Sequence, residues 1–273
     1  MLAPDTLTRP GAAEATQSQA AAGANAPLGL AAALAALHIE NKSDWAWDNY
    51  KRVVHDLCIA LKAHRILEVG GGRDPLFTPA EIEELGVEMT VNDISPKELA
   101  VLPPGYNTAC FDIAGDLSGV GHLLNTQDLA FSRMVFEHVA DGQRAWANLY
   151  EVLAPGGVAM AFIPTFYSVP FVLNWLLPDA LAAAIVKRMF AHRTDEDDPV
   201  FPARYSWCFA TEGTMRPMLS KIGYREIAIL PFYGHNYYVR FPLVRDVHKW
   251  FSGLAQSSDM RPLASYAYIV ARK

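Results

Sequence analysis

The first half of the chain alternates between short apolar runs and amphipathic segments. Five apolar runs are predicted as strands: 65–69, 87–91, 106–111, 128–132 and 158–163. Helices are predicted between them at Pro79–Leu85 and Asp141–Leu153, and a short helix or turn at Ser95–Leu102. Strands that alternate with helices predict an α/β fold, a Rossmann-like doubly wound sheet that is mostly parallel and has helices on both faces.

Two more helices are predicted before the first strand, at Leu30–His38 and Asp44–Ala63. Apolar residues at helical spacing are expected to form the buried face of the second: Trp47, Tyr50, Val54 and Leu57 or Cys58. Residues 1–28 are rich in Ala, Gly, Thr, Gln and Pro and lack the basic start and apolar core of a signal peptide. We expect a disordered tail there and a single domain over 29–273.

The pattern changes after the fifth strand. A helix is predicted at Thr211–Ile222, closed by Gly223, followed by strands at Tyr224–Leu230 and Ser265–Ala271. No crossover helix is evident in the long connection between these strands. Two late neighbouring strands of this kind can be antiparallel, which predicts a mixed sheet with insertions at about 166–210 and 234–262.

The first insertion begins with a strongly apolar stretch, Phe166–Phe190. Asn174, Pro178 and Asp179 interrupt it, so it does not read as a transmembrane span. We expect a helical lid packed on the domain. The alternative is a peripheral surface, over 166–190, that touches a membrane or a lipid-linked substrate.

Charge and cysteine content exclude several classes of function. The net charge is -6 and no Lys/Arg-rich block occurs, which argues against a nucleic-acid partner. Cys58, Cys110 and Cys208 lie far apart, which argues against a disulfide framework and against a metal site. We expect buried free thiols in a reducing compartment, and therefore a cytoplasmic protein.

A glycine-rich turn, Gly70–Gly72, follows the first strand and would let the backbone approach a ligand closely. Pro75 stands where the dinucleotide fingerprint requires a third glycine. The acids Glu68 and Asp74 flank the turn and would repel a pyrophosphate, but they would attract a ligand with a sulfonium and an amino group. The turn therefore favours S-adenosylmethionine over NAD.

Two further acids stand at the ends of the next strands. Asp93, 25 residues after Glu68, can accept hydrogen bonds from both ribose hydroxyls. Asp112 ends the third strand and can reach the adenine amino group, with Ile94 and Ile113 available to sandwich the ring. Each acid alone is typical of a turn or a cap, but three acids at three successive strand ends indicate a cofactor site.

The segment from about Arg65 to Pro164 resembles the class I S-adenosylmethionine-dependent methyltransferases. The matching motifs are Leu67–Gly72, Val91–Ser95, Phe111–Ile113, Asp128–Val139 and Leu153–Gly157. Asp74 departs from the pattern, since many members have a third glycine there. The resemblance implies a last strand that runs antiparallel, inserted beside the fifth. It also implies that Glu68 and Gly70, Gly71 and Gly72 hold the methionine part, Asp93 the ribose and Asp112 the adenine, with Ser132 and Arg133 beside the amine or the methyl.

Methyl transfer needs a general base only when the acceptor carries a proton that must leave, as a hydroxyl does. His138 follows the fourth strand and is the candidate base; alternatively, Glu137 and His138 only cap the next helix. His235 is a second candidate, in the aromatic loop Pro231–Tyr238, which either lines a substrate pocket or packs the insertion.

The segment Phe201–Cys208 resembles one found in bacterial methyltransferases of cell-surface glycan synthesis. The resemblance implies O-methylation of a small-molecule, glycan or lipid-linked acceptor, with S-adenosylhomocysteine as the second product. Candidate substrate contacts are Arg204, Tyr205, Trp207, His235 and Tyr237.

Two alternatives remain open from the sequence. One is a protein that binds the cofactor but transfers nothing, and the other, disfavoured by Pro75 and the flanking acids, is an NAD-dependent oxidoreductase. A base-methylating enzyme is disfavoured by charge and because Ser132–Val135 lacks the Asn/Asp-Pro-Pro-aromatic signature.

Overall fold

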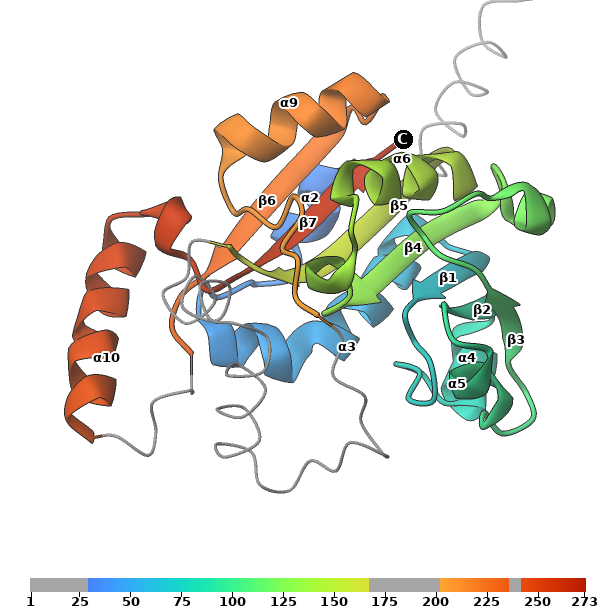
Figure 1. The fold of residues 1–273 in the computed structure, drawn as a ribbon, viewed down its shortest axis with the longest axis horizontal. Helices are drawn as coiled ribbons and strands as arrows, with labels where there is room; N and C mark the ends of the chain where they lie inside the picture. The colour runs from blue at the N-terminus through green and yellow to red at the C-terminus, as the bar shows by residue number, and fades with distance from the viewer. Residues whose placement is uncertain (1–28, 167–201, 236–241) are drawn as a thin grey trace, which may run out of the picture.

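A seven-stranded mixed sheet organises the protein in the computed structural model, which describes residues 29–166, 202–235 and 242–273 (Figure 1). The strand order is β3-β2-β1-β4-β5-β7-β6. The strands are β1 (Arg65–Val69), β2 (Glu88–Asp93), β3 (Asn107–Cys110), β4 (Gln127–Arg133), β5 (Leu153–Pro164), β6 (Glu226–Phe232) and β7 (Tyr266–Arg272). β1 to β5 are parallel, and β7 runs antiparallel between β5 and β6. The predicted mixed sheet, with its inserted antiparallel last strand, is confirmed.

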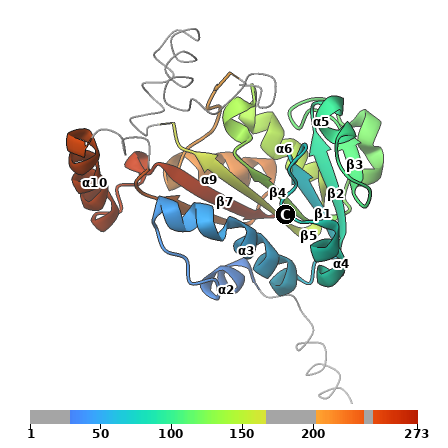
Figure 2. The same ribbon diagram turned by 90° about the horizontal axis from the view of Figure 1, so that it is seen from below.

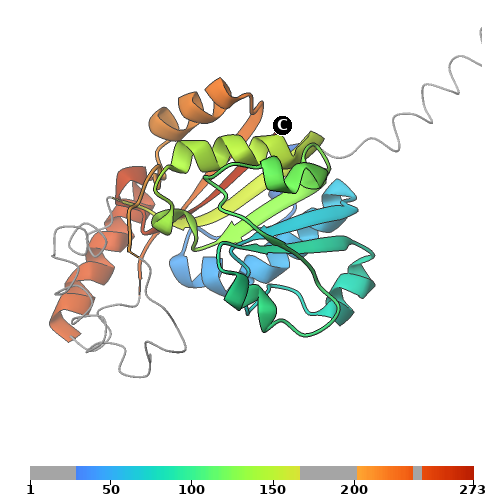
Figure 3. The same ribbon diagram turned by 45° about the vertical axis from the view of Figure 1, so that its right-hand side comes forward.

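Helices cover both faces of the sheet, as predicted (Figures 2 and 3). α3 and α4 lie on one face, and α6 and α9 lie on the other. The α-helices are α2 (Leu30–Ala35), α3 (Ser43–Leu61), α4 (Pro79–Leu85), α5 (Pro96–Ala100), α6 (Gly142–Val152), α9 (Glu212–Ile222) and α10 (Pro242–Ser257). Short 3-10 turns are η1 (Ser118–Leu123), η2 (Phe136–His138) and η3 (Arg261–Leu263).

The centre of the sheet is buried on both faces. Residues 158–163 of β5 are each at most 1% exposed, which explains why that strand is a continuous apolar run instead of an alternating one. The β5–β7 register sets Phe162 beside Tyr268, and both rings contact Tyr50 from α3. This packing fixes the position of the strand ends that carry the candidate site.

Three expectations are corrected by the structure. Trp47 lies at the exposed margin of α3, 41% accessible, although its ring contacts Phe162 and Tyr266. Cys110 is exposed, because the side chain of this edge-strand residue faces solvent, whereas Cys58 and Cys208 are buried. The connection from β6 to β7 contains a 16-residue helix, α10, where no helix was expected.

Several predictions fall outside the described residues. They are the disordered tail (1–28), most of the proposed lid with its membrane surface (167–201) and the substrate contact Tyr237. Within the described ranges, no helix combines the length and apolar character needed to cross a bilayer.

Candidate active site

The predicted cofactor residues meet at the edge of the sheet where the parallel strands end. β1 lies between β2 and β4, and its last residue, Val69, is level with Asn92 on one side and Ser132 on the other. Asp93 is level with Cys110 of β3. Ligands of open α/β sheets bind outside the carboxyl ends of the strands, which is where this arrangement brings the acids together.

The glycine turn is held tightly against this edge. The N–H groups of Gly70 and Gly71 both donate to the carbonyl of Asn92, at 2.9 and 3.0 Å. Gly70 has a φ of +74°, and a Cβ there would lie 2.4 Å from Val135 Cγ2. Gly72 has a φ of +47°, and its Cβ would lie 2.9 Å from Asp93 Oδ2. The turn therefore needs glycine both for its backbone conformation and for its close approach to the ends of β2 and β4.

Asp74, where many relatives have a third glycine, does not disrupt the turn. Its N–H donates to the carbonyl of Gly71 at 3.0 Å, which closes the loop, and its side chain is 90% exposed. Its Oδ2 lies 3.8 Å from Arg133 Nη2 at the end of β4. The two residues thus face each other across the loop as a loose ion pair.

Glu68 is a buried carboxyl beneath the turn. Its Oε2 accepts a hydrogen bond from the Leu76 N–H at 2.9 Å, so it ties the far end of the loop to β1. Burial raises the pKa of Glu68 to about 7, opposed by the Leu76 bond and by the charge of Arg133. Glu68 therefore shapes the loop, and its raised pKa means that it carries only part of the inferred negative charge near neutral pH.

The raised pKa of Glu68 predicts a pH-dependent stability. A carboxyl whose pKa is higher in the folded protein favours the protonated state, so the contribution of Glu68 to the free energy of unfolding should fall as pH rises from about 4.5 to about 7 and then level off. Glu68→Gln retains an oxygen for Leu76 but cannot ionise, so it should flatten this slope. Denaturant unfolding of both proteins at several pH values measures the difference. Equal slopes in the two proteins would contradict this assignment.

Asp93 and Asp112 adopt the same local geometry. Asp93 Oδ1 accepts from the Ser95 N–H and Asp112 Oδ1 accepts from the Ala114 N–H, each at 2.8 Å. Burial raises the pKa of Asp93, which is half-buried beside Gly72, whereas Asp112 is exposed. These turns fix each carboxylate while using only Oδ1, so both can act as acceptors for a ligand at this edge.

The two isoleucines proposed to sandwich the adenine are in different environments. Ile94 is 59% exposed at the rim of this edge, whereas Ile113 is 4% exposed and belongs to the core. The carbonyl of Ile113 accepts from Asn148 Nδ2 of α6 at 2.7 Å. Ile94 is therefore the more accessible of the two to a ring.

Asn92 was not singled out from the sequence, yet it organises the site. Its side chain is buried, and its Nδ2 donates to the carbonyls of Ala109 and Phe111, both at 2.9 Å. Its carbonyl accepts the two glycine N–H groups of the turn. A buried amide immediately before the strand-end acid Asp93 is the signal that could have identified it.

Ser132 carries a buried hydroxyl that faces no hydrogen-bond partner among the described residues. Its carbonyl accepts from the Tyr50 hydroxyl at 2.8 Å, which anchors β4 to α3. An unsatisfied buried hydroxyl is costly, and at a ligand edge it is consistent with a partner supplied by the ligand. Ser132 thus fits the position inferred for it next to Arg133.

The segment 202–208 lies across η2. It carries the proposed substrate contacts Arg204, Tyr205 and Trp207, which we call the acceptor wall, and it brings this wall next to His138. The carbonyl of Glu137 accepts from the N–H groups of Arg204 and Tyr205 at 2.6 and 3.0 Å. His138 Nδ1 lies 3.3 Å from the carbonyl oxygen of Pro202. The structure therefore brings together His138 and Arg204, which are 66 positions apart in the sequence.

Strained backbone marks this wall. Tyr205 and Trp207 have φ values of +51° and +58°, in the left-handed region that non-glycine residues rarely adopt. Tyr205 is buried against Phe166 with ring centroids 6.0 Å apart, and Trp207 contacts Phe209 at 6.4 Å. Ring packing therefore accompanies the unusual backbone conformation at both residues.

Glu137 is a second buried carboxyl. Its Oε1 lies 3.8 Å from His138 Nε2, and its Oε2 has no hydrogen-bond partner in the described ranges. Burial raises the pKa of Glu137 to about 8. Near neutral pH this group is therefore largely a neutral acid beside His138. The cap of the next helix, α6, is instead Asp141, whose Oδ1 accepts from the Arg144 N–H at 2.9 Å.

His235 is not brought to the other candidates. β7 and β6 follow β5 in the sheet, so the end of β6 lies three strands from the end of β4. The His235 ring stacks on His248 of α10 with centroids 3.9 Å apart. Burial lowers the pKa of His235 to about 3, so it is neutral at physiological pH.

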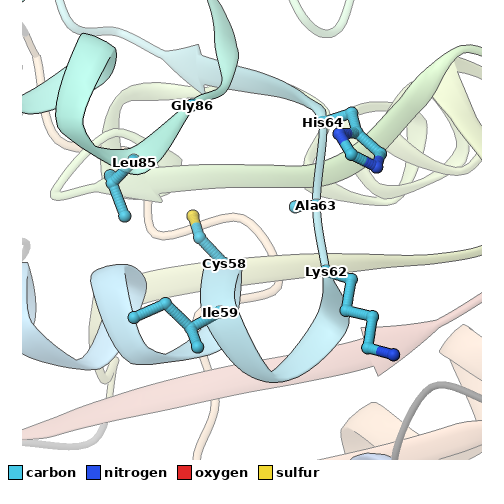
Figure 4. A pocket seen from close by; sticks show the side chains of 7 residues that line it. All are labelled: Cys58, Ile59, Lys62, Ala63, His64, Leu85 and Gly86. Atoms are coloured by element: carbon cyan, nitrogen blue, oxygen red, sulfur yellow. The ribbon is translucent and has the colours of Figure 1, made fainter. Parts of the chain in front are cut away.

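Two cavities lie at the opposite edge of the sheet. One, of about 190 Å³, lies where α3 ends and β1 begins, and is shown in Figure 4. Its lining comprises Cys58, Ile59, Lys62, Ala63, His64, Leu85 and Gly86. The other, of about 530 Å³, lies at the starts of the first four strands and includes Arg65, Glu88, Asn107 and Gln127. Neither adjoins the strand-end acids. The described residues contain no group of three or more His, Cys, Asp or Glu side chains suited to a metal ion.

Comparisons with known proteins identify the fold. Residues 67–161 match the model of a family described as a methyltransferase domain. No curated protein sequence matches the chain. Among solved structures, the CurJ carbon methyltransferase is 15% identical with a TM-score of 0.51, covering 85% of this chain and 56% of its own. The DszA carbon methyltransferase is 14% identical with a TM-score of 0.52, covering 83% and 54%. The chain thus spans about half the length of these two proteins, and the likeness is one of fold.

Proposed function

We propose that this chain, which carries a class I S-adenosylmethionine-dependent methyltransferase domain, binds S-adenosylmethionine at the carboxyl ends of β1 to β4 and transfers its methyl group to a hydroxylated acceptor. The observation that carries the proposal is the glycine turn packed against Asp93. Gly70 and Gly72 leave no room for a side chain, Glu68 and Asp93 lie against the turn, and Asp112 follows the neighbouring strand β3. One end of this set of groups would attract a cationic ligand group, and the other end is rich in hydrogen-bond acceptors.

The residues present fit the cofactor part by part. Asp93 would accept from the ribose hydroxyls, and Asp112 from the adenine amino group, with Ile94 against the ring. Gly70 to Gly72, Glu68 and Ser132 would surround the methionine part, with Arg133 next to Ser132 at the end of β4. The buried, unpartnered hydroxyl of Ser132 supports this fit, because a polar ligand at this edge would satisfy it.

S-adenosylmethionine supplies a methyl carbon already activated by its sulfonium. The protein therefore mainly has to align the acceptor, exclude water and, for a hydroxyl acceptor, take a proton. Arg204, Tyr205 and Trp207 would form the wall that orients the acceptor, since the segment that carries them lies across η2. We place a sugar or another hydroxylated small molecule, free or lipid-linked, at this wall.

His138 is the proposed general base. Its Nδ1 faces the carbonyl of Pro202, which favours a proton on Nδ1, so Nε2, which lies 3.8 Å from Glu137 Oε1, is the nitrogen that would accept the proton. His138→Asn should lower kcat for a hydroxyl acceptor by about 100-fold or more while leaving cofactor affinity unchanged. Turnover and calorimetric titration of the two proteins provide the measurement. Unchanged kcat would reduce His138 to an anchor of the 202–208 segment.

The test of the function is formation of S-adenosylhomocysteine with a panel of hydroxylated acceptors. Product that depends on both cofactor and acceptor would support a transferase. Cofactor binding without turnover on any acceptor would favour a binding protein of the same fold.

The three free cysteines agree with a reducing, cytoplasmic location for the enzyme.

A further inference from the structure

Arg73 and Glu98 form a bidentate ion pair at the rim of the candidate site. Arg73 Nε donates to Glu98 Oε2 at 2.5 Å, and its Nη2 donates to Oε1 at 2.8 Å. Arg73 directly follows the glycine turn, and Glu98 lies on α5, the helix that follows β2. Bidentate pairs of this kind fix the orientation of both side chains. The pair, which we call the clasp, therefore ties the loop after β1 to the helix after β2.

The clasp lies against Gly72 and Asp93. A Cβ on Gly72 would lie 2.9 Å from Asp93 Oδ2 and 3.5 Å from Glu98 Cβ. Gly72 is the residue next to Arg73, so both members of the clasp stand beside the point where the turn meets the acid. A change in the spacing between the turn and α5 would therefore change the space beside the Asp93 carboxylate.

α5 depends on contacts of this kind for its position. It has five residues, none of them buried, and Leu99 is half-buried against the core. A helix this short is not stable in isolation. α5 lies beside β2 and β3, of which β3 is the edge strand (Figures 1 and 2). Ser95, whose N–H fixes Asp93, immediately precedes α5, so a shift of the helix would reach the acid.

The clasp also controls the charge beside Asp93. The hydrogen bonds from Arg73 hold the pKa of Glu98 below its ordinary value, so Glu98 is ionised at neutral pH. Burial raises the pKa of Asp93, and the negative charge of Glu98 also raises it. Arg73 supplies the positive charge that compensates Glu98. Without Arg73, an uncompensated carboxylate would stand beside the acid proposed to accept from the ribose.

We propose that the clasp positions the cofactor site, by holding the glycine turn and α5 at the spacing that the ribose of S-adenosylmethionine requires. Arg73 and Glu98 are positioning residues, because they act through Gly72 and Asp93. This role rests on the proposed function, which assigns the ribose to Asp93. Ion pairs with an exposed member contribute little to folding stability, and Arg73 is 44% exposed. A site that is already ordered binds its ligand more tightly, so the clasp should affect cofactor affinity more than the stability of the fold.

Calorimetric titration of the full chain with S-adenosylhomocysteine tests this role. Arg73→Gln and Glu98→Gln should each weaken binding about tenfold, because two side chains and the loop between them must then be ordered on binding. The double variant should bind no more weakly than either single variant, since each substitution alone already breaks the pair. The melting temperatures of all three variants should match that of the wild type.

Lys51→Gln is the matched control. Lys51 Nζ lies 2.6 Å from Glu81 Oε1, and this pair joins α3 to α4 through a cation that is 45% exposed. Its removal should leave cofactor affinity unchanged. Hydrogen exchange of the cofactor-free protein adds a readout that needs no ligand. The amides of residues 71–76 should exchange faster in Arg73→Gln than in the wild type or in Lys51→Gln.

Two kinds of failure are distinguishable. A wild type that binds no S-adenosylhomocysteine would contradict the proposed function, and the role of the clasp with it. A wild type that binds, with unchanged affinity in Arg73→Gln and Glu98→Gln, would overturn the role of the clasp alone. Losses of affinity that add in the double variant would also overturn it. So would a lower melting temperature in the clasp variants without a loss of affinity, since the pair would then only stabilise the fold.

Discussion

Asp93→Ala should weaken S-adenosylmethionine binding about 100-fold. The carboxylate is fixed by the Ser95 N–H and lies against Gly72, where it can accept from both ribose hydroxyls. Two hydrogen bonds to a charged acceptor contribute about 1.5 kcal/mol each, and about 3 kcal/mol corresponds to roughly 100-fold in Kd. Calorimetric titration of the wild type and the variant measures the difference.

Asp116 provides a matched control for this variant. It makes the same type of turn, since its Oδ1 accepts from the Ser118 N–H at 3.1 Å, but it is exposed and not at a strand end. Asp116→Ala removes an aspartate that makes the same backbone turn and also accepts from the Ser118 hydroxyl, and it should leave cofactor affinity unchanged. Asp93→Asn should bind with intermediate affinity, because the amide retains one acceptor. If Asp93→Ala and Asp116→Ala bound the cofactor equally well, the ribose would lie elsewhere.

Gly70→Ala should lower the free energy of unfolding by about 3 kcal/mol and abolish measurable cofactor binding. A left-handed φ costs a residue with a Cβ roughly 1–2 kcal/mol, and an added methyl in a packed site costs roughly 1–3 kcal/mol more. The methyl would lie 2.4 Å from Val135 Cγ2, so either the turn or the segment after β4 must shift. Denaturant unfolding and calorimetry give the two quantities.

Gly86→Ala separates the two contributions. Gly86 has a φ of +67°, close to that of Gly70, but a Cβ there meets nothing within 4 Å. It should therefore show only the backbone cost, with cofactor affinity intact. Combining Gly70→Ala with Val135→Ala should recover part of the lost stability, as a double-mutant cycle would reveal. Equal effects of the two alanine variants would mean that the turn is not tightly packed.

The sequence predicted the parts of the fold and site that depend on local pattern. The parallel strands followed from buried apolar runs, and the positions of Asp93 and Asp112 followed from the way strands end. The glycine turn was identified from its run of three glycines. The close approach of Gly70 to Val135 explains why glycine is required there. These features are encoded within a few residues, so a single chain suffices to find them.

Features that depend on distant contacts were not predictable in the same way. Two hydrogen bonds form only when the loop closes. One joins Glu68 to the Leu76 N–H, and the other joins the Asn92 side-chain amide of β2 to the Ala109 carbonyl of β3. The sequence analysis did not predict α10, although Val247, Trp250, Phe251 and Leu254 have helical spacing. This spacing was overlooked because the connection from β6 to β7 lacks a conventional crossover pattern. Trp47 was assigned to the core because helical periodicity identifies the apolar face of α3. Periodicity does not show where that face reaches the edge of the domain.

The strand-end acids and the glycine turn are expected to bind S-adenosylmethionine. Calorimetric titration of the full chain with S-adenosylhomocysteine, and separately with NAD, tests this expectation most directly. We expect binding of S-adenosylhomocysteine at one site per chain, weakened in Asp93→Ala, and no heat of binding from NAD. Tight binding of NAD with none of S-adenosylhomocysteine or S-adenosylmethionine would contradict the account.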